Sequence, residues 1–373
     1  MKIVGIEAIP LQAEFKEPFR FGRIVRTRSS NVLVRIDTDQ GIVGWGEACP
    51  VPQLTAETQE SIVTVIRDRV APVITGRDAL SWRRTVAEAA VVLHGFTTTR
   101  AAIETAVLDV CGKAMGEPLW VVLGGAYRQS VTVHGSVGWD EDAGAYAADA
   151  ARQAELYRTL KLYVGRDELS SDLARIDAAR AAIGPDIRLI VDVNGLWTRT
   201  EALRAGRRLA DAGVDVLEQP IDPADLAGSA EITAAYGQMY GIDVAADESL
   251  MSLSSALQVT RSRAASLATI GVSKLGGPVA ALDIARTAQA AGICTLVGSV
   301  VELGVAAAAG AHLAACVPRL PYASYLMGPR KYARQVTSEL EIVDGMLLVP
   351  DGPGLGIEVD ERAVADLDLR RRP

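Results

Sequence analysis

Hydrophobic and polar residues follow two different patterns along the chain, and the change falls near residue 125. In the first part, alternating apolar residues predict half-buried strands at residues 2–13, 30–37 and 42–48. Helical spacing then predicts helices at residues 58–70, 81–92 and 98–115. A sheet followed by helices indicates an α+β domain over residues 1–125, which ends at the glycine pair of Leu123-Gly124-Gly125-Ala126.

From residue 130 onward, short apolar runs alternate with helical segments. The expected strands lie at residues 131–134, 159–164, 187–191, 214–217, 242–245, 266–270, 293–297 and 322–325. Strict alternation of this kind predicts a parallel β/α barrel over residues 126–328. The segment 329–373 returns to strand and turn patterns, and we expect it to pack on the first domain. The Ala-rich run at 303–317 is too short to span a bilayer and predicts a buried helix.

An acidic residue stands at the end of the third, fourth and fifth expected barrel strands: Asp192, Glu218 and Asp247. The gaps of 26 and 29 residues each fit one strand, one helix and two short loops. Three strand-end carboxylates would meet at one rim and repel one another unless a hard divalent cation binds them. Mg²⁺ is the expected ion, with Mn²⁺ as a possible substitute. Alternatively, each acid only caps the helix that follows.

Composition limits the classes of function. The chain has 373 residues with 49% hydrophobic and 23% charged residues, which is ordinary for a globular protein with a large core. Its net charge of −8, without a basic cluster, argues against a nucleic-acid partner, and no segment predicts a membrane span. Four widely spaced cysteines and a strand-like N-terminus without a signal peptide indicate a reduced, cytoplasmic location.

Other polar residues are expected near the same rim. Lys161 and Tyr163 are two residues apart on the second strand, so both side chains point into the barrel, where they can act on a substrate or only fill space. Gly271 takes the inward position at the end of the sixth strand, and glycine cannot transfer a proton. Lys274 is expected to face elsewhere and to be structural. Glu302, after the seventh strand, either binds substrate or caps a helix.

The histidines and glycine-rich segments do not indicate a further catalytic or phosphate-binding site. His134 lies at the end of the first expected barrel strand, where a structural role is the simpler interpretation. No glycine-rich loop follows a strand and opens a helix, so no phosphate loop is predicted.

Together these motifs resemble the enolase superfamily, and within it the muconate-lactonizing subgroup of muconate cycloisomerases, o-succinylbenzoate synthases and dipeptide epimerases. The matching segments are Lys2-Ile3-Val4, Gly44-Trp45-Gly46-Glu47-Ala48, Asp192-Val193-Asn194, Glu218-Gln219-Pro220, Ala246-Asp247-Glu248-Ser249 and Gly354-Leu355-Gly356-Ile357. The resemblance covers nearly the whole chain. It implies an α/β fold, a modified (β/α)7β TIM-type barrel with an α+β capping domain formed by the N-terminal part and the C-terminal tail.

The resemblance also implies a chemistry. It assigns Mg²⁺ to Asp192, Glu218 and Asp247, with a small carboxylate substrate on the metal and an enediolate-type intermediate. Relatives of this kind are often homo-oligomers, and we expect the same here.

Two positions depart from the family pattern. The usual Lys-x-Lys of the second strand is Lys161-Leu162-Tyr163, and the lysine expected five residues before the Gly276-Gly277 pair is replaced by Gly271. Both usual proton-transfer lysines are therefore absent from their positions. A reaction with one acid/base group remains possible, and we predict that Tyr163, with its pKa lowered by Mg²⁺ and Lys161, is that group.

The leading hypothesis is therefore a Mg²⁺-dependent cycloisomerase or lyase that acts on a small carboxylate, with Tyr163 and Lys161 as the catalytic pair. The alternatives are a dehydratase of a hydroxy acid, an epimerase or racemase of an amino-acid derivative, and a non-catalytic barrel that binds a carboxylate.

Substrate contacts are expected from several places. Asn194 and Glu248 belong to the acidic motifs, and Glu302 lies near the rim. Phe19 and Arg20 belong to the segment 15–28, which carries four arginines and in the family closes over the substrate. The arginines suit an anionic substrate such as a dicarboxylate, unless the segment is a solvated charged loop.

Overall fold

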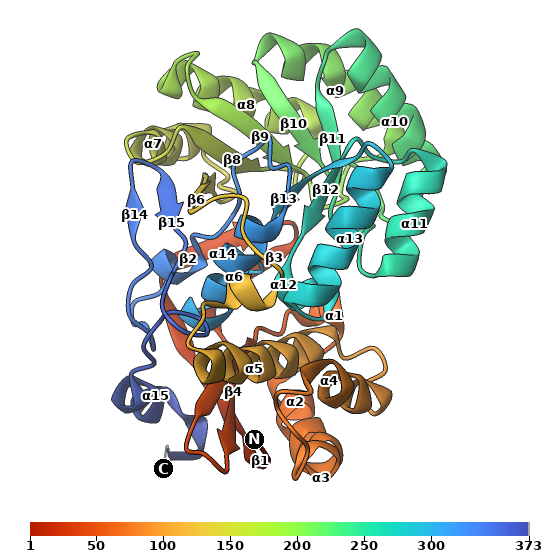
Figure 1. Cartoon of the computed structure of the whole chain (residues 1–373). Coiled ribbons are helices and arrows are strands. Elements are labelled where there is room, and N and C mark those ends of the chain that lie inside the picture. The colour runs from red at the N-terminus through yellow and green to blue at the C-terminus, as the bar shows by residue number, and fades with distance from the viewer. Residues whose placement is uncertain (372–373) are drawn as a thin grey trace.

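The computed structural model describes residues 1–371 and shows a capping domain beside a barrel (Figure 1). The capping domain contains an antiparallel sheet in the order β1 (Ile3–Pro10), β4 (Val32–Thr38) and β5 (Val43–Ala48). Its helices are α1 (Pro52–Thr55), α2 (Gln59–Val65), α3 (Ala71–Ile74), α4 (Trp82–Val91), α5 (Thr97–Met115) and α6 (Leu119–Val122), with a π-helical turn at Ile66–Val70. The three strands, α4, α5 and the helical segment from α2 through the π-helical turn match the predicted elements within a few residues, whereas the short helices α1, α3 and α6 were not predicted.

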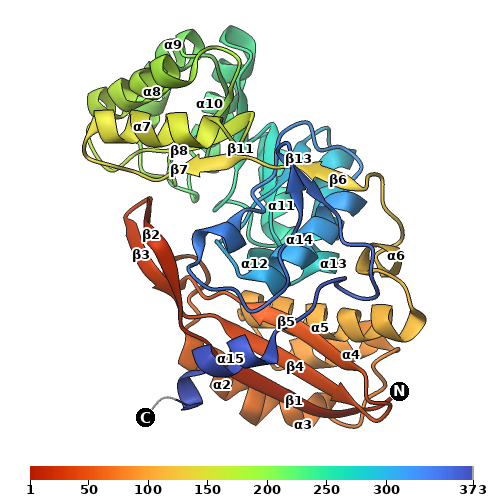
Figure 2. The same ribbon diagram turned by 90° about the vertical axis from the view of Figure 1, so that its left-hand side faces the viewer.

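The segment 15–28 is not an irregular loop. It forms a hairpin of β2 (Ala13–Phe21) and β3 (Ile24–Ser29), which rises from the capping domain towards β7 and β8 of the barrel (Figure 2). The turn uses Gly22, whose φ of +46° is a conformation that glycine adopts readily. A side chain there would also meet Cβ of Asn194 at 3.2 Å, so the hairpin tip lies directly against the end of strand β9.

Seven parallel strands form the barrel sheet, in sequence order. They are β7 (Gly135–Val137), β8 (Thr159–Tyr163), β9 (Arg188–Asp192), β10 (Val214–Glu218), β11 (Asp243–Ala246), β12 (Leu267–Ile270) and β13 (Cys294–Val297). The helices between and after them are α7 (Ala143–Ala154), α8 (Leu169–Ile183), α9 (Arg199–Asp211), α10 (Leu226–Met239), α11 (Leu253–Ser262), α12 (Val272–Leu275), α13 (Pro278–Ala290) and α14 (Gly304–Cys316). The predicted barrel order is confirmed.

Two expected strands differ from the prediction. The segment 131–134 is not one barrel strand: β6 (Ser130–Thr132) pairs with the C-terminal β15, and β7 begins only at Gly135. The segment 322–325 is too short for a regular strand but closes the barrel, because Tyr325 N donates to Val297 O at 2.7 Å and His134 N donates to Ser324 O at 3.1 Å. Alternation alone did not show that residue 133 separates two strands.

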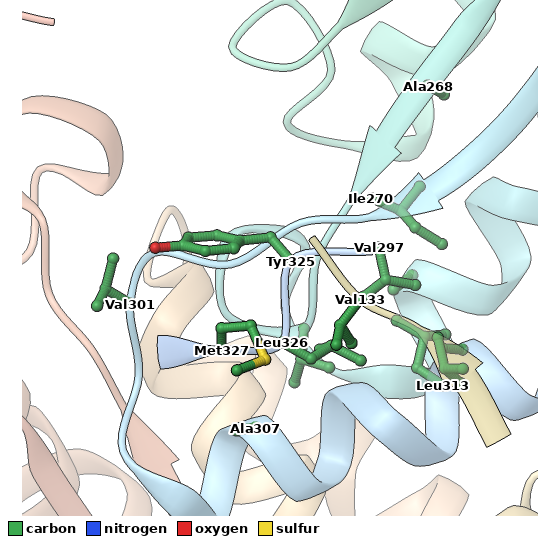
Figure 3. Close-up of a cluster of buried hydrophobic side chains, with 14 of the residues drawn as sticks. Val133, Ala268, Ile270, Val297, Val301, Ala307, Leu313, Tyr325, Leu326 and Met327 are labelled. Atoms are coloured by element: carbon green, nitrogen blue, oxygen red, sulfur yellow. The ribbon is translucent and has the colours of Figure 1, made fainter. Parts of the chain in front are cut away.

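The barrel core has an inner and an outer part. Inside, a small apolar cluster fills the lower barrel: Ile190, Val216, Ala245, Leu267 and Leu296. Outside, Ile270 and Val297 face α14, which contributes Ala307 and Leu313 (Figure 3). All thirteen residues of α14 are buried, as predicted for the Ala-rich run. Within residues 1–371, no helix combines the length and the apolar character that a bilayer crossing requires.

The C-terminal segment contacts both domains. Strand β15 (Met346–Leu348) pairs with β14 (Ile342–Val343) on one side and with β6 on the other, so this part lies beside the barrel rather than in the capping domain, which corrects part of the prediction. The remainder returns to the capping domain, where Leu355 N donates to the Asp109 carboxylate at 2.8 Å. Helix α15 (Glu361–Leu367) and a last 3-10 turn (Leu369–Arg371) follow, and residues 372–373 of the predicted segment lie outside the described part.

Glu47 joins the capping domain to the barrel. Its buried carboxylate accepts hydrogen bonds from Leu303 N at 2.7 Å and Ala306 N at 2.9 Å, at the N-terminus of α14. The helix end supplies unpaired N–H groups to an anion. Burial nevertheless raises the pKa of Glu47 to about 7, more than these hydrogen bonds lower it.

This shift predicts a pH-dependent stability. Since the folded pKa of Glu47 lies above the ordinary value of 4.5, the folded state binds more protons than the unfolded state between these values. Its contribution to the free energy of unfolding therefore falls as pH rises from about 5 to 7, by up to about 1.4 kcal/mol per pH unit, and is constant above.

Urea unfolding at pH 5, 6, 7 and 8 checks the prediction by comparing the wild-type protein with Glu47→Gln. The wild type should lose stability relative to the variant up to pH 7. The control is Glu361→Gln, at an exposed position. Because this variant keeps Glu47, the difference in stability between it and the wild type should not change with pH. A difference between wild type and Glu47→Gln that does not change with pH would contradict the assignment.

Candidate active site

The ends of the barrel strands enclose a cavity of about 430 Å³, and the hairpin β2–β3 forms its opposite wall. The register aligns the strand ends, because Tyr163 pairs with Asp192 and Asp192 pairs with Glu218. Nine of the ten predicted site residues come from the strand ends or the hairpin, and the tenth, Glu302, follows β13. The predicted residues that line the cavity are Phe19, Lys161, Tyr163, Asp192, Asn194, Glu218, Asp247, Glu248 and Glu302.

Lys161 joins two of the acids. Its Nζ donates to Glu218 Oε1 at 2.8 Å and to Asp192 Oδ2 at 3.2 Å, and all three side chains are almost completely buried. Although burial lowers the pKa of Lys161, the carboxylates of Glu218 and Asp192 raise it well above its usual value. Its ammonium group balances part of the negative charge of these two acids.

Lys274 corrects one of the predictions. It does not face away from the barrel, because its Nζ donates to the main-chain oxygen of Asp247 at 2.9 Å and forms an ion pair with the Asp247 carboxylate. It is 4% exposed and lines the cavity. The alternation rule failed because the strand ends at Ile270, and the short helix α12 turns Lys274 back towards the barrel mouth.

Gly271 leaves space that Lys274 uses. Its φ of −160° is extended backbone that any residue adopts, so backbone conformation does not require a glycine here. A Cβ at this position would lie 3.3 Å from Gly298 O and 3.7 Å from Cγ of Lys274. The lysine chain therefore passes next to the place where a side chain at position 271 would begin.

Tyr163 lies on the other side of the acids. In the sheet order, β8 precedes the three acidic strands and β12 follows them, so Tyr163 and Lys274 flank the carboxylates. The ring of Phe19 packs edge-on against Tyr163 with centroids 5.5 Å apart. Burial raises the pKa of Tyr163 well above its usual value and outweighs Lys161, which lowers it. Lys161 thus lowers the pKa of Tyr163 as predicted, but by itself it does not outweigh burial.

Asn194 and Glu248 contact each other at the rim, where Asn194 Nδ2 donates to Glu248 Oε1 at 3.1 Å. Burial and the charge of Asp247 raise the pKa of Glu248 well above its usual range. Glu302 accepts a hydrogen bond from Ser273 Oγ at 3.0 Å, so it holds the loop after β13 against α12.

The arginines of the hairpin do not form an anion site. Arg20 lines a neighbouring crevice instead of the cavity, and its main-chain oxygen accepts a hydrogen bond from Trp139 N at 2.9 Å. Arg26 donates to Val300 O at 2.7 Å and to Ser29 Oγ at 2.8 Å, which ties the hairpin to the barrel. Arg28 is exposed, and Arg23 alone of the four lines the cavity, at its exposed edge.

Two lining or supporting residues were not singled out from the sequence. Gln219 is buried, and its Oε1 accepts hydrogen bonds from Asp247 N at 3.0 Å, Ser249 N at 3.0 Å and Ser249 Oγ at 2.9 Å. It fixes the position of Asp247 relative to β10. Thr269 lines the cavity with a buried hydroxyl that has no partner within residues 1–371. The only feature of the sequence that could have indicated this role of Gln219 is its position directly after the acidic residue Glu218.

The donor set fits a divalent cation. Four acids lie at the rim, two of them buried (Asp192 and Glu218) and two partly exposed (Asp247 and Glu248). In the described part of the chain they face two lining ammonium groups, and Glu218 Oε2 and Glu248 Oε2 have no hydrogen-bond partner. Oxygen ligands of this type suit Mg²⁺. Within residues 1–371, no three acidic, His or Cys side chains approach one point as ligands of one ion. The ammonium groups of Lys161 and Lys274 pair with the carboxylates instead.

His134 has a structural role in this arrangement. Its ring stacks on Tyr325 at 5.1 Å, and Tyr325 OH lies 3.1 Å from Ser136 Oγ. Burial lowers the pKa of His134 to about 3, so the ring is neutral. This agrees with the interpretation from the sequence.

Comparison with known proteins covers both domains. Residues 5–124 match the family described as "Mandelate racemase / muconate lactonizing enzyme, N-terminal domain", and residues 145–363 match "Enolase C-terminal domain-like". The muconate lactonizing enzyme of Pseudomonas fluorescens, solved in complex with muconolactone, superposes with a TM-score of 0.94 at 31% identity, over 98% of this chain and 99% of that one.

Relatives with nearly the same sequence identity to this chain have different activities. The L-Ala-D/L-Glu epimerase of Bacillus subtilis is 32% identical over 96% of this chain and 97% of its own length. Muconate cycloisomerase 1 of Pseudomonas putida is 31% identical over 97% of each chain. These values are too close to favour one activity over the other.

Proposed function

Because the chain belongs to the mandelate racemase / muconate lactonizing enzyme family of the enolase superfamily, we propose that it is a Mg²⁺-dependent isomerase or lyase that transfers a proton at the carbon next to a substrate carboxylate. The family consists of enzymes, and its members named above are isomerases. The arrangement of Tyr163 and Lys274 on either side of the three acids carries the proposal.

Asp192, Glu218 and Asp247 would hold the metal, with Mn²⁺ as a possible substitute for Mg²⁺. When bound, the ion supplies positive charge that stabilises negative charge developing on the substrate carboxylate. Lys161 adds a fixed cation beside the same carboxylates, and Asn194 and Glu248 shape the edge of the site. Each of these groups is held by a hydrogen bond or an ion pair to a neighbour, which favours a site that is ordered before substrate binds.

Tyr163 is the proton-transfer group of the leading candidate, a cycloisomerase or lyase. Its ring packs against Phe19, and Tyr163 lines the cavity at the strand end next to Asp192. In cycloisomerisation one proton is delivered to the carbon next to the carboxylate, and in elimination one proton is removed from it. Either reaction needs only one acid/base group at that carbon.

Lys274 favours a second candidate, an epimerase. Epimerisation requires a donor and an acceptor on opposite faces of one carbon, and Lys274 supplies N–H groups across the acids from Tyr163. The side chain thus reaches the region left open by Gly271. The absence of the usual strand lysine does not exclude this reaction.

A substrate panel separates these candidates. Muconates, hydroxy acids, dipeptides and N-acylamino acids are incubated with the full chain and Mg²⁺, and products are followed by mass spectrometry and chiral chromatography. Ring closure without a mass change indicates a cycloisomerase, loss of water a dehydratase, and inversion at one carbon an epimerase. Failure to convert any member, with Mg²⁺ bound, would contradict the proposal.

Gln219 gives a prediction about the metal. Gln219→Leu removes the acceptor of three hydrogen bonds to the segment 247–249, so Asp247 loses its fixed position. We expect Mg²⁺ affinity, measured by calorimetry, to fall about 10- to 100-fold. The exposed Gln238→Leu on α10 is the matched control and should bind Mg²⁺ like the wild type. Equal affinity in both variants would show that Gln219 does not orient a ligand.

A further inference from the structure

The cavity has two ends of different chemistry. One end contains the acids and the two lysines, and the other is lined by apolar side chains from separate elements. The apolar wall includes Phe21 and Ile24 of the hairpin, Leu54 of α1, Leu196 after β9, and Val300 after β13. Residues far apart in the sequence, three of them from the capping domain, therefore bring apolar side chains to the cavity that the acids also line; we call this apolar lining the apolar end.

Charge is almost absent from the apolar end. The hairpin arginines are directed elsewhere: Arg26 is hydrogen-bonded to Val300 O and Ser29, and Arg20 lines the neighbouring crevice. Gln53 and Arg23 remain as polar lining residues there, and both are exposed at the edge. A second carboxylate in this end would lose its hydration without gaining a buried cationic partner, which is unfavourable.

We propose that the substrate is a monocarboxylate whose other end is an aliphatic or aromatic group, and not a dicarboxylate. The proposal rests on the proposed function, because the acid end must first hold the carboxylate through its metal. The apolar end then gains stability by removing the hydrocarbon group from water. It reverses the expectation drawn from the four arginines of the segment 15–28.

A matched pair of ligands tests this specificity. Hexanoate and adipate have six carbons each and differ in whether the far end is a methyl group or a second carboxylate. Calorimetry is performed on the full chain loaded with Mg²⁺, with each ligand titrated separately. We expect hexanoate to bind at least about tenfold tighter than adipate. Equal or tighter binding of adipate would overturn the proposal.

A variant locates the discriminating surface. Leu54→Arg places a cation in the apolar end, so the ratio of adipate to hexanoate affinity should rise at least about tenfold relative to wild type. Leu80→Arg, at an exposed position of the capping domain, is the control and should leave the ratio unchanged. An unchanged ratio in Leu54→Arg would show that the far end of the ligand does not lie there and would overturn the assignment.

The same experiment separates this inference from the function on which it rests. If neither carboxylate binds while calorimetry still detects Mg²⁺ binding, the carboxylate-binding function itself fails. If both bind and adipate is preferred, the function stands and only the substrate class is wrong.

Discussion

Glu218→Gln is expected to lower Mg²⁺ affinity by more than about 100-fold and to abolish turnover. Glu218 is completely buried between Lys161 and the other acids, and its Oε2 has no hydrogen-bond partner within residues 1–371. The amide has nearly the same shape but no charge, so the change removes a ligand while preserving the packing. Removing a metal ligand should cost more than the 10- to 100-fold typical of residues that only orient ligands.

Calorimetry with Mg²⁺ measures this effect directly, and far-UV circular dichroism confirms that the variant is folded. Glu339→Gln, whose side chain is 79% exposed, is the matched control and should bind Mg²⁺ like the wild type. Wild-type affinity in Glu218→Gln would remove Glu218 from the metal site. A loss of affinity in Glu339→Gln as well would point to a nonspecific charge effect.

Tyr163→Phe is expected to lower kcat by about 10²–10⁴-fold on any substrate found in the panel, the range typical of a lost acid/base group. The phenylalanine keeps the ring contact with Phe19, so substrate binding and the fold should change little. Mg²⁺ affinity should also stay within the experimental error, because the hydroxyl group is not among the assigned metal ligands.

The matched control is Tyr127→Phe, at a position that is 67% exposed. It should retain wild-type kcat and KM. A rise in KM with unchanged kcat in Tyr163→Phe would assign Tyr163 to substrate binding alone. Full activity would leave Lys274 as the remaining candidate for proton transfer.

The main architecture was predictable from the sequence because it depends on local patterns. Short apolar runs between helical segments located the barrel strands, and the spacing of Asp192, Glu218 and Asp247 placed three carboxylates at consecutive strand ends. The structure brings all three to one cavity. The periodicity of two also placed Lys161 and Tyr163 on one face of β8, where both line that cavity.

Features that depend on how a chain bends after a strand were not predictable. Lys274 was assigned to the wrong side because the alternation was continued through α12, a helix of one turn. Likewise, the arginine-rich segment was expected to face the substrate. It became a hairpin in which Arg26 binds main-chain oxygen and Arg20 lies outside the cavity. Such hydrogen bonds form between residues distant in sequence and leave no local pattern.

The most direct test of the central claim is solvent-deuterium incorporation. The wild-type enzyme converts a substrate from the panel in D₂O with Mg²⁺, and mass spectrometry and NMR locate the label in the product. For an isomerised product, we predict one deuterium at the carbon next to the carboxylate, with its incorporation lost in Tyr163→Phe and in Glu218→Gln. For an elimination product, we predict instead that a substrate deuterated at that carbon loses its label to the solvent. An isomerised product that forms at the wild-type rate without deuterium at that carbon, or an elimination product that retains the label there, would contradict proton transfer at that carbon.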